Sequence, residues 1–483
     1  MGTAFYEKKI IVVGLARSGV GAANLLASLG AKVTVTDSKG PQHLDEFIKT
    51  LDPGVSLALG NHPSELFESA DLIVISPGVP PDIGPLAVAR RKGIRIIGEL
   101  ELAFQALHSG AVKSISAVPE FLAVTGTNGK STTTALLNEM LRIGGIETVL
   151  GGNIGNSLAA EVLDAIKLGK GTAARYIVAE LSSFQLETIE SFRPRGATIL
   201  NVTPDHLDRY HEMDAYMKAK CRISLNQDAT DFLVLNADDP GTTEVEAIIG
   251  SQKQKPTLFY FSRKGKVDGI YYEKGSIRFN LSGDKLGKLE RGLVPPAASS
   301  VIDPGSFRIK GVHNVENAMG AALMAYLAGC SIEGIKNALA AFPGLEHRLE
   351  FVREIDGVRY INDSKGTNVG AVLKSLEGFT EPVILIAGGR DKDSDFSLLR
   401  PLIKERVKRL VLVGEAANKI SRAVCNVTEC VMAGSNFREA LTKAKEAAVP
   451  GDVVLLSPAC ASFDMFRDYE DRGRQFKRMV MEL

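Results

Sequence analysis

Short apolar runs alternate with helical patterns along the first hundred residues. Residues 20–29 place apolar side chains at helical spacing and end at Gly30. Around them lie four apolar runs rich in Val and Ile, the pattern of buried strands: 8–14, 31–37, 70–80 and 93–102. Buried strands separated by helices predict an open parallel α/β sheet, because helical crossovers cover both of its faces.

The same pattern returns twice further along the chain. Residues 121–134 predict a strand, a loop and the start of a helix, and 313–329 predict an amphipathic helix. Between them, 256–310 carries short alternating runs that predict antiparallel hairpins. The remaining predicted strands are 176–184, 197–206, 231–240, 358–364, 382–389, 409–414 and 452–458.

Two stretches divide the chain into three α/β domains, of which the middle one is the largest. Residues 109–120 form a looser stretch that predicts a linker, and 342–350 carries Pro and Gly and predicts a hinge. At about 100–200 residues per domain, a chain of 483 residues also suggests about three domains. We therefore expect domains at 1–108, 109–344 and 345–483.

The composition is that of a folded globular protein, with 45% hydrophobic and 24% charged residues. Lys+Arg and Asp+Glu both number 57, so the formal net charge of zero gives no basic footprint for nucleic acid. No apolar run approaches the roughly 18 residues that span a bilayer, and Ile10–Val13 is too short for a signal peptide. We therefore expect a cytoplasmic protein that binds neither nucleic acid nor membrane.

The cysteines and histidines do not form a recognisable metal motif. Five cysteines, an odd number without C-x-x-C spacing, predict reduced thiols rather than a disulfide framework or a zinc site. His206 and His211 lie five residues apart, and no further Cys or His completes a zinc site with them.

The strongest chemical signal is the run from Gly126 to Thr132, GTNGKST, which follows a predicted strand and opens a helix. Glycines there let backbone N–H groups face phosphate oxygens at the helix N-terminus. Lys130 can reach the β- and γ-phosphates of a nucleotide, and the Ser131 hydroxyl can ligate Mg²⁺. Val124 occupies the first glycine position of the general phosphate-loop motif, so the match is imperfect.

A second glycine turn, Gly14 to Gly19, follows the first predicted strand and has Ala16 at the middle glycine of the dinucleotide motif. Asp37 ends the next strand, where an acidic side chain can bind a ribose hydroxyl. From the spacing alone, this turn fits NAD, another diphosphate nucleotide, or tight helix–strand packing without a ligand.

Polar side chains follow two strands of the middle domain. Glu180 ends one strand, and Asp205 and His206 end the next. In an open parallel sheet such loops form the ligand crevice beside the phosphate loop, where these groups could complete Mg²⁺ coordination. Lys220 lies on a helical pattern and is, by composition alone, a surface lysine.

Further polar groups gather near the hinge and in the last domain. Asn314 and Asn317 lie one helical turn apart, and Arg348 can present its guanidinium to a phosphate. Three strand-end loops of the last domain suggest a second ligand surface that faces the hinge, with candidate residues Asp363, Lys365, Thr367, Lys392 and Ser462.

Together these motifs resemble the Mur ligase family, the ATP-dependent amino-acid ligases of peptidoglycan precursor synthesis. Segments 126–132, 151–155, 311–318 and 345–350 resemble the general family motifs, and the resemblance covers essentially the whole chain. The segments that resemble the D-glutamate-adding branch are ELSSFQLE (180–187), NVTPDHLDRY (201–210), INDSKGTN (361–368) and SPACASFDMF (458–467).

The resemblance implies a three-domain α/β fold. The N-terminal domain would be Rossmann-like and bind a uridine nucleotide at Gly14–Gly19. The central domain would be a P-loop ATPase domain with added antiparallel strands. The C-terminal domain would be Rossmann-like and bind the incoming amino acid, and closure at the hinge would bring the parts together.

The resemblance also implies a role for each candidate residue. Lys130, Glu180, His206 and Lys220 would be catalytic, and Mg²⁺ would be held by Ser131, Glu180, His206 and Lys220. ATP would bind Gly126, Thr127, Asn128, Gly129, Lys130, Ser131, Thr132, Asn314, Asn317, Arg348 and Asp363. The UDP-substrate would bind Arg17, Ser18, Asp37, Ser38, Lys39, Ser76, Gly78, Asn153 and Ser182. D-Glutamate would bind Thr367, Lys392, Ser462 and Phe463.

Resemblance gives Lys220 a role that its composition does not suggest. The matching lysine of the family is carbamylated with bicarbonate or CO₂, so that it presents a carboxylate to a second Mg²⁺. Carbamylation at neutral pH requires a free amine and hence a locally lowered pKa.

The implied reaction joins D-glutamate to UDP-N-acetylmuramoyl-L-alanine through an acyl phosphate, which gives an amide, ADP and phosphate. The expected partners are these small molecules, and the expected state is a monomer. Three other functions stay open: another amino-acid ligase of the same superfamily, an NAD-binding oxidoreductase that uses Gly14–Gly19, and a P-loop switch protein without ligase chemistry.

Overall fold

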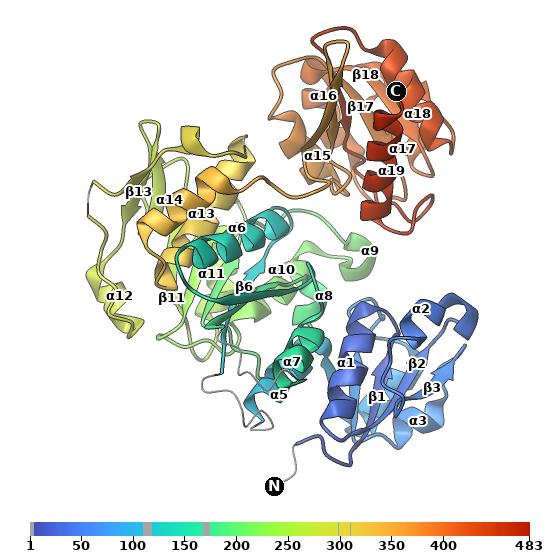
Figure 1. Ribbon diagram of the computed structural model, residues 1–483, viewed down its shortest axis with the longest axis vertical. Coiled ribbons are helices and arrows are strands. Elements are labelled where there is room, and N and C mark those ends of the chain that lie inside the picture. The colour runs from blue at the N-terminus through green and yellow to red at the C-terminus, as the bar shows by residue number, and fades with distance from the viewer. Residues whose placement is uncertain (1–3, 110–117, 168–173, 298, 310) are drawn as a thin grey trace.

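Three β-sheets, one after another along the chain, organise the computed structural model, which describes residues 4–109, 118–167, 174–297, 299–309 and 311–483 (Figure 1). Each sheet has its own set of covering helices. The predicted α/β class is therefore confirmed. Most of the predicted linker, 110–117, lies outside the described residues, and the predicted domain boundaries stay predictions.

The first sheet is parallel, with strand order β3-β2-β1-β4-β5. Its strands are β1 (Lys9–Val13), β2 (Lys32–Asp37), β3 (Ser56–Leu59), β4 (Leu72–Ile75) and β5 (Ile96–Gly98). Its helices are α1 (Arg17–Ser28), η1 (Pro41–His43), α2 (Asp45–Ile48), α3 (Ser64–Glu68), α4 (Gly84–Arg91) and α5 (Glu99–His108). The predicted strand at 93–102 is wrong beyond residue 98, because the Glu and Leu residues that follow are strong helix formers and start α5.

The second sheet has nine strands in the order β14-β13-β12-β11-β10-β9-β6-β8-β7. Strands β7 to β12 are parallel, while β12–β13 and β13–β14 pair antiparallel, as the alternating runs predict. The strands are β6 (Glu120–Thr125), β7 (Thr148–Gly152), β8 (Tyr176–Glu180), β9 (Gly196–Ile199), β10 (Phe232–Asn236), β11 (Thr257–Ser262), β12 (Gly269–Glu273), β13 (Ser276–Asn280) and β14 (Val301–Ile302).

Long helices cover the second sheet, and short helical turns lie in the loops between its strands. The predicted amphipathic helix at 313–329 is confirmed as α13, which packs against α6. The helices are α6 (Lys130–Ile143), α7 (Leu158–Lys167), α8 (Ser183–Leu186), α9 (Leu207–Tyr210), α10 (Met213–Cys221), η2 (Arg222–Ser224), α11 (Thr242–Gly250), α12 (Gly283–Lys288), η3 (Pro304–Ser306), α13 (Val312–Leu327) and α14 (Ile332–Ala341).

The third sheet has the order β15-β16-β20-β17-β18-β19, with β15 antiparallel to β16 and the other pairs parallel. Its strands are β15 (Glu350–Ile355), β16 (Val358–Asn362), β17 (Val383–Gly388), β18 (Val407–Val413), β19 (Glu429–Met432) and β20 (Val453–Leu456). Its helices are α15 (Val369–Leu376), η4 (Phe396–Leu399), α16 (Arg400–Arg406), α17 (Ala417–Val424), α18 (Phe437–Ala447) and α19 (Tyr469–Met481).

One hydrophobic core runs from the first sheet into the second. It joins apolar side chains of α1 and α5 to those of α7, β8 and β9 in a single buried cluster. The two core clusters of the third sheet, by contrast, contain only residues from Leu349 onward. No helix in the described part of the chain has the length and apolar character needed to cross a membrane.

Two carboxylates of α5 are buried in the interface between the first two sheets. Glu99 Oε1 accepts a hydrogen bond from the Ala159 N–H at 2.6 Å. Glu101 accepts from the backbone N–H groups of Glu190, Ser191 and Phe192, each at 2.9 Å. Burial raises the pKa of Glu99 to about 7, against a partial lowering by hydrogen bonds from backbone N–H groups of α7.

We expect the free energy of unfolding of the unsubstituted protein to fall relative to that of Glu99→Gln as the pH rises from 5 to 8. Between the ordinary pKa of 4.5 and about 7, the folded protein holds a proton on Glu99 that the unfolded chain releases. This bound proton contributes about 3 kcal/mol to the free energy of unfolding. The contribution is fully present below pH 4.5 and is lost as the pH rises through 7. Urea unfolding of both proteins at pH 5 and pH 8 measures this, and a constant difference would contradict it.

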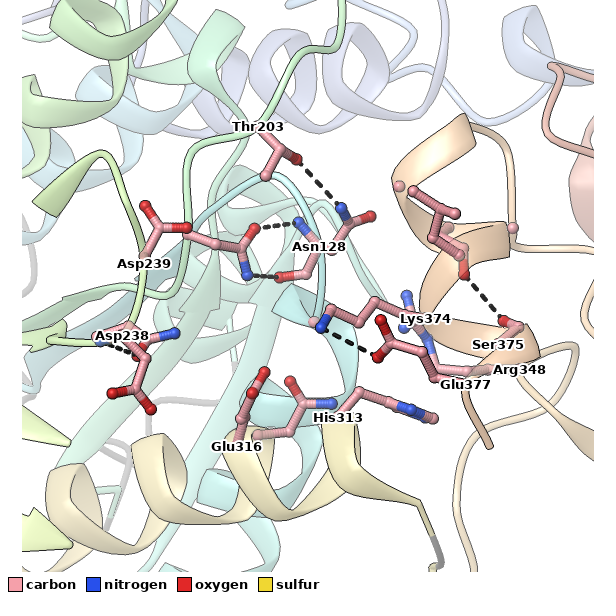
Figure 2. Close-up of a pocket in the computed structure, with 18 of the residues that line it drawn as sticks. Asn128, Thr203, Asp238, Asp239, His313, Glu316, Arg348, Lys374, Ser375 and Glu377 are labelled. Atoms are coloured by element: carbon pink, nitrogen blue, oxygen red, sulfur yellow. Dashed lines mark hydrogen bonds and ion pairs between the residues drawn. The ribbon is translucent and has the colours of Figure 1, made fainter. Parts of the chain in front are cut away.

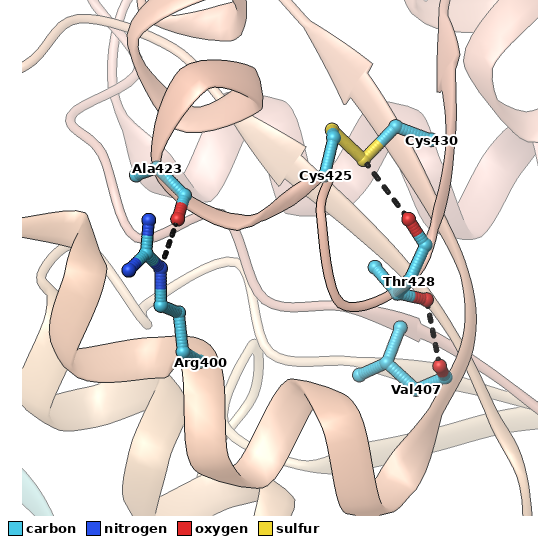
Figure 3. The surroundings of a disulfide bond; sticks show 6 residues. All are labelled: Arg400, Val407, Ala423, Cys425, Thr428 and Cys430. Carbon is cyan, nitrogen blue, oxygen red and sulfur yellow. Dashed lines mark hydrogen bonds between the residues drawn. A yellow bond between two sulfur atoms is a disulfide. The ribbon is translucent and has the colours of Figure 1, made fainter.

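The prediction that all five cysteines are reduced is wrong for one pair. Cys425 and Cys430 form a disulfide between the end of α17 and β19, with Cα atoms 5.6 Å apart (Figure 3). The turn between helix and strand brings together two residues five positions apart, a spacing that a search for C-x-x-C does not cover. Cys221, Cys330 and Cys460 are free and buried.

We expect Cys425→Ser to lower the stability of the third domain by about 2 kcal/mol, the chain-entropy value for so short a loop. Substrate turnover should not change, because the pair lies outside the strand-end loops 363–367, 388–392 and 457–463. Melting temperatures with and without a reductant check this: the reductant should bring the unsubstituted protein down to the variant and leave the variant unchanged. An equal fall in both proteins would contradict the assignment.

Candidate active site between the second and third sheets

The phosphate loop joins β6 to α6 at the carboxyl edge of the second sheet. Gly129 has a φ of +83°, and a Cβ there would lie 2.3 Å from Asn317 Oδ1, so only glycine fits. Lys130 Nζ donates to the carbonyl oxygens of Gly126 at 3.0 Å and Thr127 at 2.8 Å. The loop and its lysine thus have the form that the sequence predicts.

Lys220 reaches the same loop from α10. Its side chain is only 1% exposed, and its Nζ donates to the Gly126 carbonyl at 2.7 Å and lies 4.4 Å from the centre of the Tyr216 ring. Burial, and next the nearby charge of Lys130, hold the pKa of Lys220 well below its usual value. The composition-based interpretation of Lys220 as a surface lysine is therefore wrong.

Glu180 ends β8 beside the phosphate loop and is almost completely buried. Its Oε1 accepts from Asn153 Nδ2 at 2.9 Å, while its Oε2 is buried without a hydrogen-bond partner. Burial alone would raise the pKa of Glu180, but Lys365, Lys130 and hydrogen bonds from Asn153 and Ser131 together lower it. The result is an ionised carboxylate with an unused oxygen next to the phosphate loop.

These groups fit a Mg²⁺ ion. Carboxylate and hydroxyl oxygens are the ligands that Mg²⁺ prefers, together with phosphate oxygens and waters. The orphaned Glu180 Oε2 and the buried hydroxyl of Ser131 lie at the phosphate loop, and Thr132 Oγ1 is also buried without a partner. Among the described residues, no three His, Cys, Asp or Glu side chains form a metal site of their own. A site here therefore depends on oxygens from bound nucleotide.

His206, the fourth predicted metal ligand, has a left-handed backbone with a φ of +56° at the start of α9. Its ring packs edge-on against Phe184, with centroids 4.8 Å apart, and its Nε2 lies 3.7 Å from Asp205 Oδ2. The metal roles of Ser131, Glu180, His206 and Lys220 all stay predictions.

Asp205 connects the second and third domains, a role that sequence reasoning missed. Its Oδ2 accepts from Asn368 Nδ2 at 3.1 Å, and its Oδ1 lies 3.8 Å from Lys392 Nζ. Asn368 Nδ2 also donates to Asn128 Oδ1 of the phosphate loop at 3.4 Å. Burial raises the pKa of Asp205, but Lys392, followed by His206 and Lys130, lowers it overall. The phosphate loop therefore lies directly against the third domain.

A cavity of about 330 Å³ lies between these domains beside the phosphate loop (Figure 2). Five of the predicted ATP-binding residues line it: Asn128, Gly129, Asn317, Arg348 and Asp363. Sequence reasoning missed other residues that line the cavity, although the polar end of the predicted strand at 231–240 pointed to some of them. The missed residues are Asn236, Asp238, Asp239, Arg263, Lys264, Glu316 and Lys374. Asn314 instead lines a neighbouring cavity behind the hinge, which it shares with Arg348.

The hinge presents Arg348 from an unusual stretch of backbone. Its neighbours His347 and Leu349 have φ values of +64° and +44°, which are rare for residues other than glycine. Arg348 Nε is buried without a hydrogen-bond partner. Asp363 is committed to internal bonds, since its Oδ2 accepts from Ser375 Oγ and Ser457 Oγ, both at 2.7 Å. Of the two, Arg348 is the one with a free donor for a nucleotide.

The predicted UDP-substrate residues lie at the carboxyl edge of the first sheet and in the loops facing it. Asp37 holds the glycine turn, because its two oxygens accept from the N–H groups of Leu15 at 2.7 Å and Lys39 at 2.9 Å. Arg17 Nη1 donates to the Gly155 carbonyl at 3.4 Å, and Ser182 caps α8. The others form the exposed or half-buried rim of this edge or support its turns: Ser18, Ser38, Lys39, Ser76, Gly78 and Asn153.

The predicted D-glutamate residues come from three loops of the third sheet. Lys392 faces Asp205, Ser462 is buried, Thr367 is half-buried, and Phe463 is 61% exposed. Lys365, which the sequence had only placed on this surface, lies over the Tyr469 ring. Burial lowers its pKa to about 8, against a raising by the charge of Glu180.

A buried arginine of α19 supports these loops and was also missed. Arg472 donates to the Ser364 carbonyl at 2.8 Å and to the Cys460 carbonyl at 3.2 Å. It therefore fixes the two loops that carry Thr367 and Ser462.

Three features define the class of protein: a phosphate loop at the edge of a largely parallel sheet, an ionised carboxylate beside it, and a second α/β domain that faces both. This class is the multidomain enzymes of nucleotide-dependent group transfer. Comparison with known families narrows this. Residues 8–98 match the model "Mur ligase MurD-like, N-terminal domain", 124–325 match "Mur ligase middle domain", and 347–460 match "Mur ligase, glutamate ligase domain".

Relatives align along the full chain. A protein of Geotalea daltonii named UDP-N-acetylmuramoylalanine--D-glutamate ligase is 44% identical over 478 residues, 99% of this chain and 98% of its own. One of the same name from Pelotomaculum thermopropionicum is 42% identical over 481 residues, again 99% and 98%. The chain belongs to the Mur ligase family.

Solved structures share the fold at low sequence identity. UDP-N-acetylmuramate-alanine ligase MurC from Thermotoga maritima has a TM-score of 0.60 at 18% identity and covers 99% of this chain and 100% of its own. MurF from Acinetobacter baumannii has a TM-score of 0.59 at 18% identity, with 99% and 91% coverage.

Proposed function

We propose that this protein joins D-glutamate to UDP-N-acetylmuramoyl-L-alanine, with ATP converted to ADP and phosphate, in peptidoglycan precursor synthesis. The observation that carries the proposal is the meeting of the phosphate loop with the third domain through Asp205, Asn368 and Lys392. It supports an ATP site and an amino-acid site that lie next to each other. The names of the full-length relatives support the choice of both substrates.

In the first step, the carboxylate of the UDP-linked acceptor attacks the γ-phosphorus of ATP, and ADP leaves. Lys130 would exchange its hydrogen bonds to the carbonyls of its own loop for bonds to phosphate oxygens. Its positive charge would then stabilise the negative charge on the transferring phosphoryl group. Arg348, with its free buried donor, is placed to bind the nucleotide across the hinge. In the second step, the amine of D-glutamate attacks the acyl carbon, phosphate leaves, and the amine loses a proton to give the amide.

Mg²⁺ would supply charge neutralisation on the transferring phosphoryl group when bound. We propose Ser131 and Glu180 for one site, and His206 with carbamylated Lys220 as further ligands. Carbamylation forms a bond from the neutral Lys220 amine to the carbon of CO₂, with loss of one proton. The buried position of Lys220 and its lowered pKa support this modification.

The amino-acid site is proposed at Thr367, Lys392, Ser462 and Phe463. Lys392 has the charge to pair with a carboxylate of the substrate, and its Nζ already lies 3.8 Å from the Asp205 carboxylate. We further propose that the protein acts as a monomer, since one chain supplies every residue of the proposed site. Its likeness to ligases of peptidoglycan precursor synthesis supports the proposal that it acts in the cytoplasm.

The test measures phosphate release from ATP with Mg²⁺ and UDP-N-acetylmuramoyl-L-alanine while amino acids are added one at a time. Release that requires D-glutamate, with a product heavier by one glutamyl residue, is the expected result. Release with L-alanine or a diamino acid would keep the family and change the substrate. Release without any acceptor would overturn the ligase proposal.

A further inference from the structure

Glu99 lies outside every residue set that the proposed reaction uses. It is 2% exposed, its Oε1 accepts from Ala159 N–H, and its Oε2 is buried without a hydrogen-bond partner. The first N–H groups of a helix have no partner within the helix and need an oxygen acceptor from outside it. Glu99, which comes from α5 of the first domain, supplies that acceptor for Ala159 N–H, while Ser157 Oγ accepts from Ala160 N–H.

α7 follows directly on the loop 151–157, whose other end is bonded to Glu180. Asn153 N–H donates to the Glu180 carbonyl and Asn153 Nδ2 to Glu180 Oε1, both at 2.9 Å. A Cβ at Gly152, which has a φ of +105°, would lie 2.4 Å from the Glu180 carbonyl oxygen. The loop therefore packs tightly against the backbone of Glu180 and also contacts its carboxylate through Asn153.

The first domain contacts the same segment from a second element, α1. A Cβ at Gly21 would lie 2.2 Å from Ser157 Oγ, so α1 approaches the start of α7 as closely as glycine permits. Arg17 donates to the Gly155 carbonyl within the loop. The loop between β7 and α7 is thus fixed at its far end by the first domain.

We propose that Glu99 is a positioning residue that fixes the N-terminus of α7 and, through the loop 151–157, sets the positions of Asn153 and Glu180. Removing its carboxylate leaves the Ala159 N–H without its acceptor and takes away one of the contacts that hold the loop at that end, beside those of Arg17 and Gly21. The kinetic consequence rests on the proposed function, whereas the structural consequence does not.

Glu101 provides a matched control. It lies two residues further along α5 and is equally buried, but it accepts from the N–H groups of Glu190, Ser191 and Phe192. Those residues precede β9 and do not belong to the loop 151–157. A general weakening of the interface would follow from changing either glutamate, whereas a positioning effect on Asn153 and Glu180 follows only from Glu99.

Amide hydrogen exchange of the full-length protein tests the structural part. Glu99→Ala should speed exchange in residues 151–160 about tenfold and leave 187–195 unchanged, and Glu101→Ala should do the reverse. Glu99→Gln keeps one oxygen acceptor and should restore most of the protection. If Glu99→Ala does not fold, Glu99→Asp, with its carboxylate withdrawn by one methylene, should give the same segment-specific change at smaller size. Equal acceleration of both segments, or of neither, would overturn the proposal.

Steady-state kinetics test the consequence for the reaction. Glu99→Ala should raise the KM for the UDP-linked acceptor about tenfold, as a change in a supporting partner of a metal site does. The KM for D-glutamate should stay within about twofold of its original value, because its proposed residues lie on the third domain, and Glu101→Ala should move neither constant. If the unsubstituted protein shows no D-glutamate-dependent release, the proposed function fails while hydrogen exchange still decides the role of Glu99.

Discussion

Lys130→Ala is expected to lower D-glutamate-dependent phosphate release about 10³-fold, because it removes the cation that stabilises charge on the transferring phosphoryl group. Lys130 Nζ now bonds to two carbonyl oxygens of its own loop, which hold the ammonium where phosphate oxygens would replace them. The loss should fall on kcat, since the interaction is strongest in the transition state. Initial rates at saturating substrates measure it.

Arg142→Ala supplies the control for this variant. Arg142 lies on the same helix, α6, but its side chain is 60% exposed and forms an ion pair with Glu139 of that helix. It should leave kcat within about twofold, as surface substitutions of this kind have little effect on structure. Comparable losses in both variants would mean that α6 had been disturbed and that the phosphate role of Lys130 is wrong.

Lys220→Ala is expected to cost about 10²- to 10³-fold in turnover and to remove any dependence on bicarbonate. The side chain is buried against the Gly126 carbonyl, and burial together with the charge of Lys130 keeps its pKa low enough for a neutral amine to react with CO₂. The unsubstituted protein incubated with ¹³C-bicarbonate should show a carbamate carbon resonance that Lys220→Ala lacks.

Lys218→Ala is the matched control, because Lys218 lies on the same helix with a side chain that is 62% exposed and pairs with Asp214. It should keep both the resonance and the activity. A carbamate signal that persists in Lys220→Ala, or full activity of that variant, would show that Lys220 is not the modified residue.

The elements that could be predicted from sequence are those whose own pattern decides them. α13 has apolar residues on helical spacing over four turns, and β17 is a continuous apolar run, so both are found close to their predicted places. β3, β7 and β19 have few buried residues, and their pairing with neighbouring strands, rather than their own pattern, makes them strands. Segment 93–102 looks like one strand because polar and apolar residues alternate in its second half, but Glu and Leu there favour a helix, and α5 begins at Glu99.

The candidate site divides in the same way. GTNGKST is a local motif, and its backbone geometry follows from its glycines. The pairing of Asp205 with Asn368 and Lys392 depends on which loops of two separate sheets face each other, and a single sequence does not contain that information. Glu99 and Glu101 are hidden for a related reason: acidic residues on a helix usually face solvent, and only the packing of α5 against α7 and against residues 190–192 places these two in the interior.

The hydrophobic core shared by the first two sheets has a mechanical consequence. Because α1, α5 and α7 belong to one buried cluster, the first two sheets form a single body, which carries the phosphate loop together with the residues proposed for the UDP-substrate. The third sheet has its own core and joins this body through the hinge and a few polar contacts at Asn128 and Asp205. We therefore expect relative motion to be concentrated at the hinge, which would carry the residues proposed for D-glutamate toward a phosphate loop that stays fixed on the other two sheets.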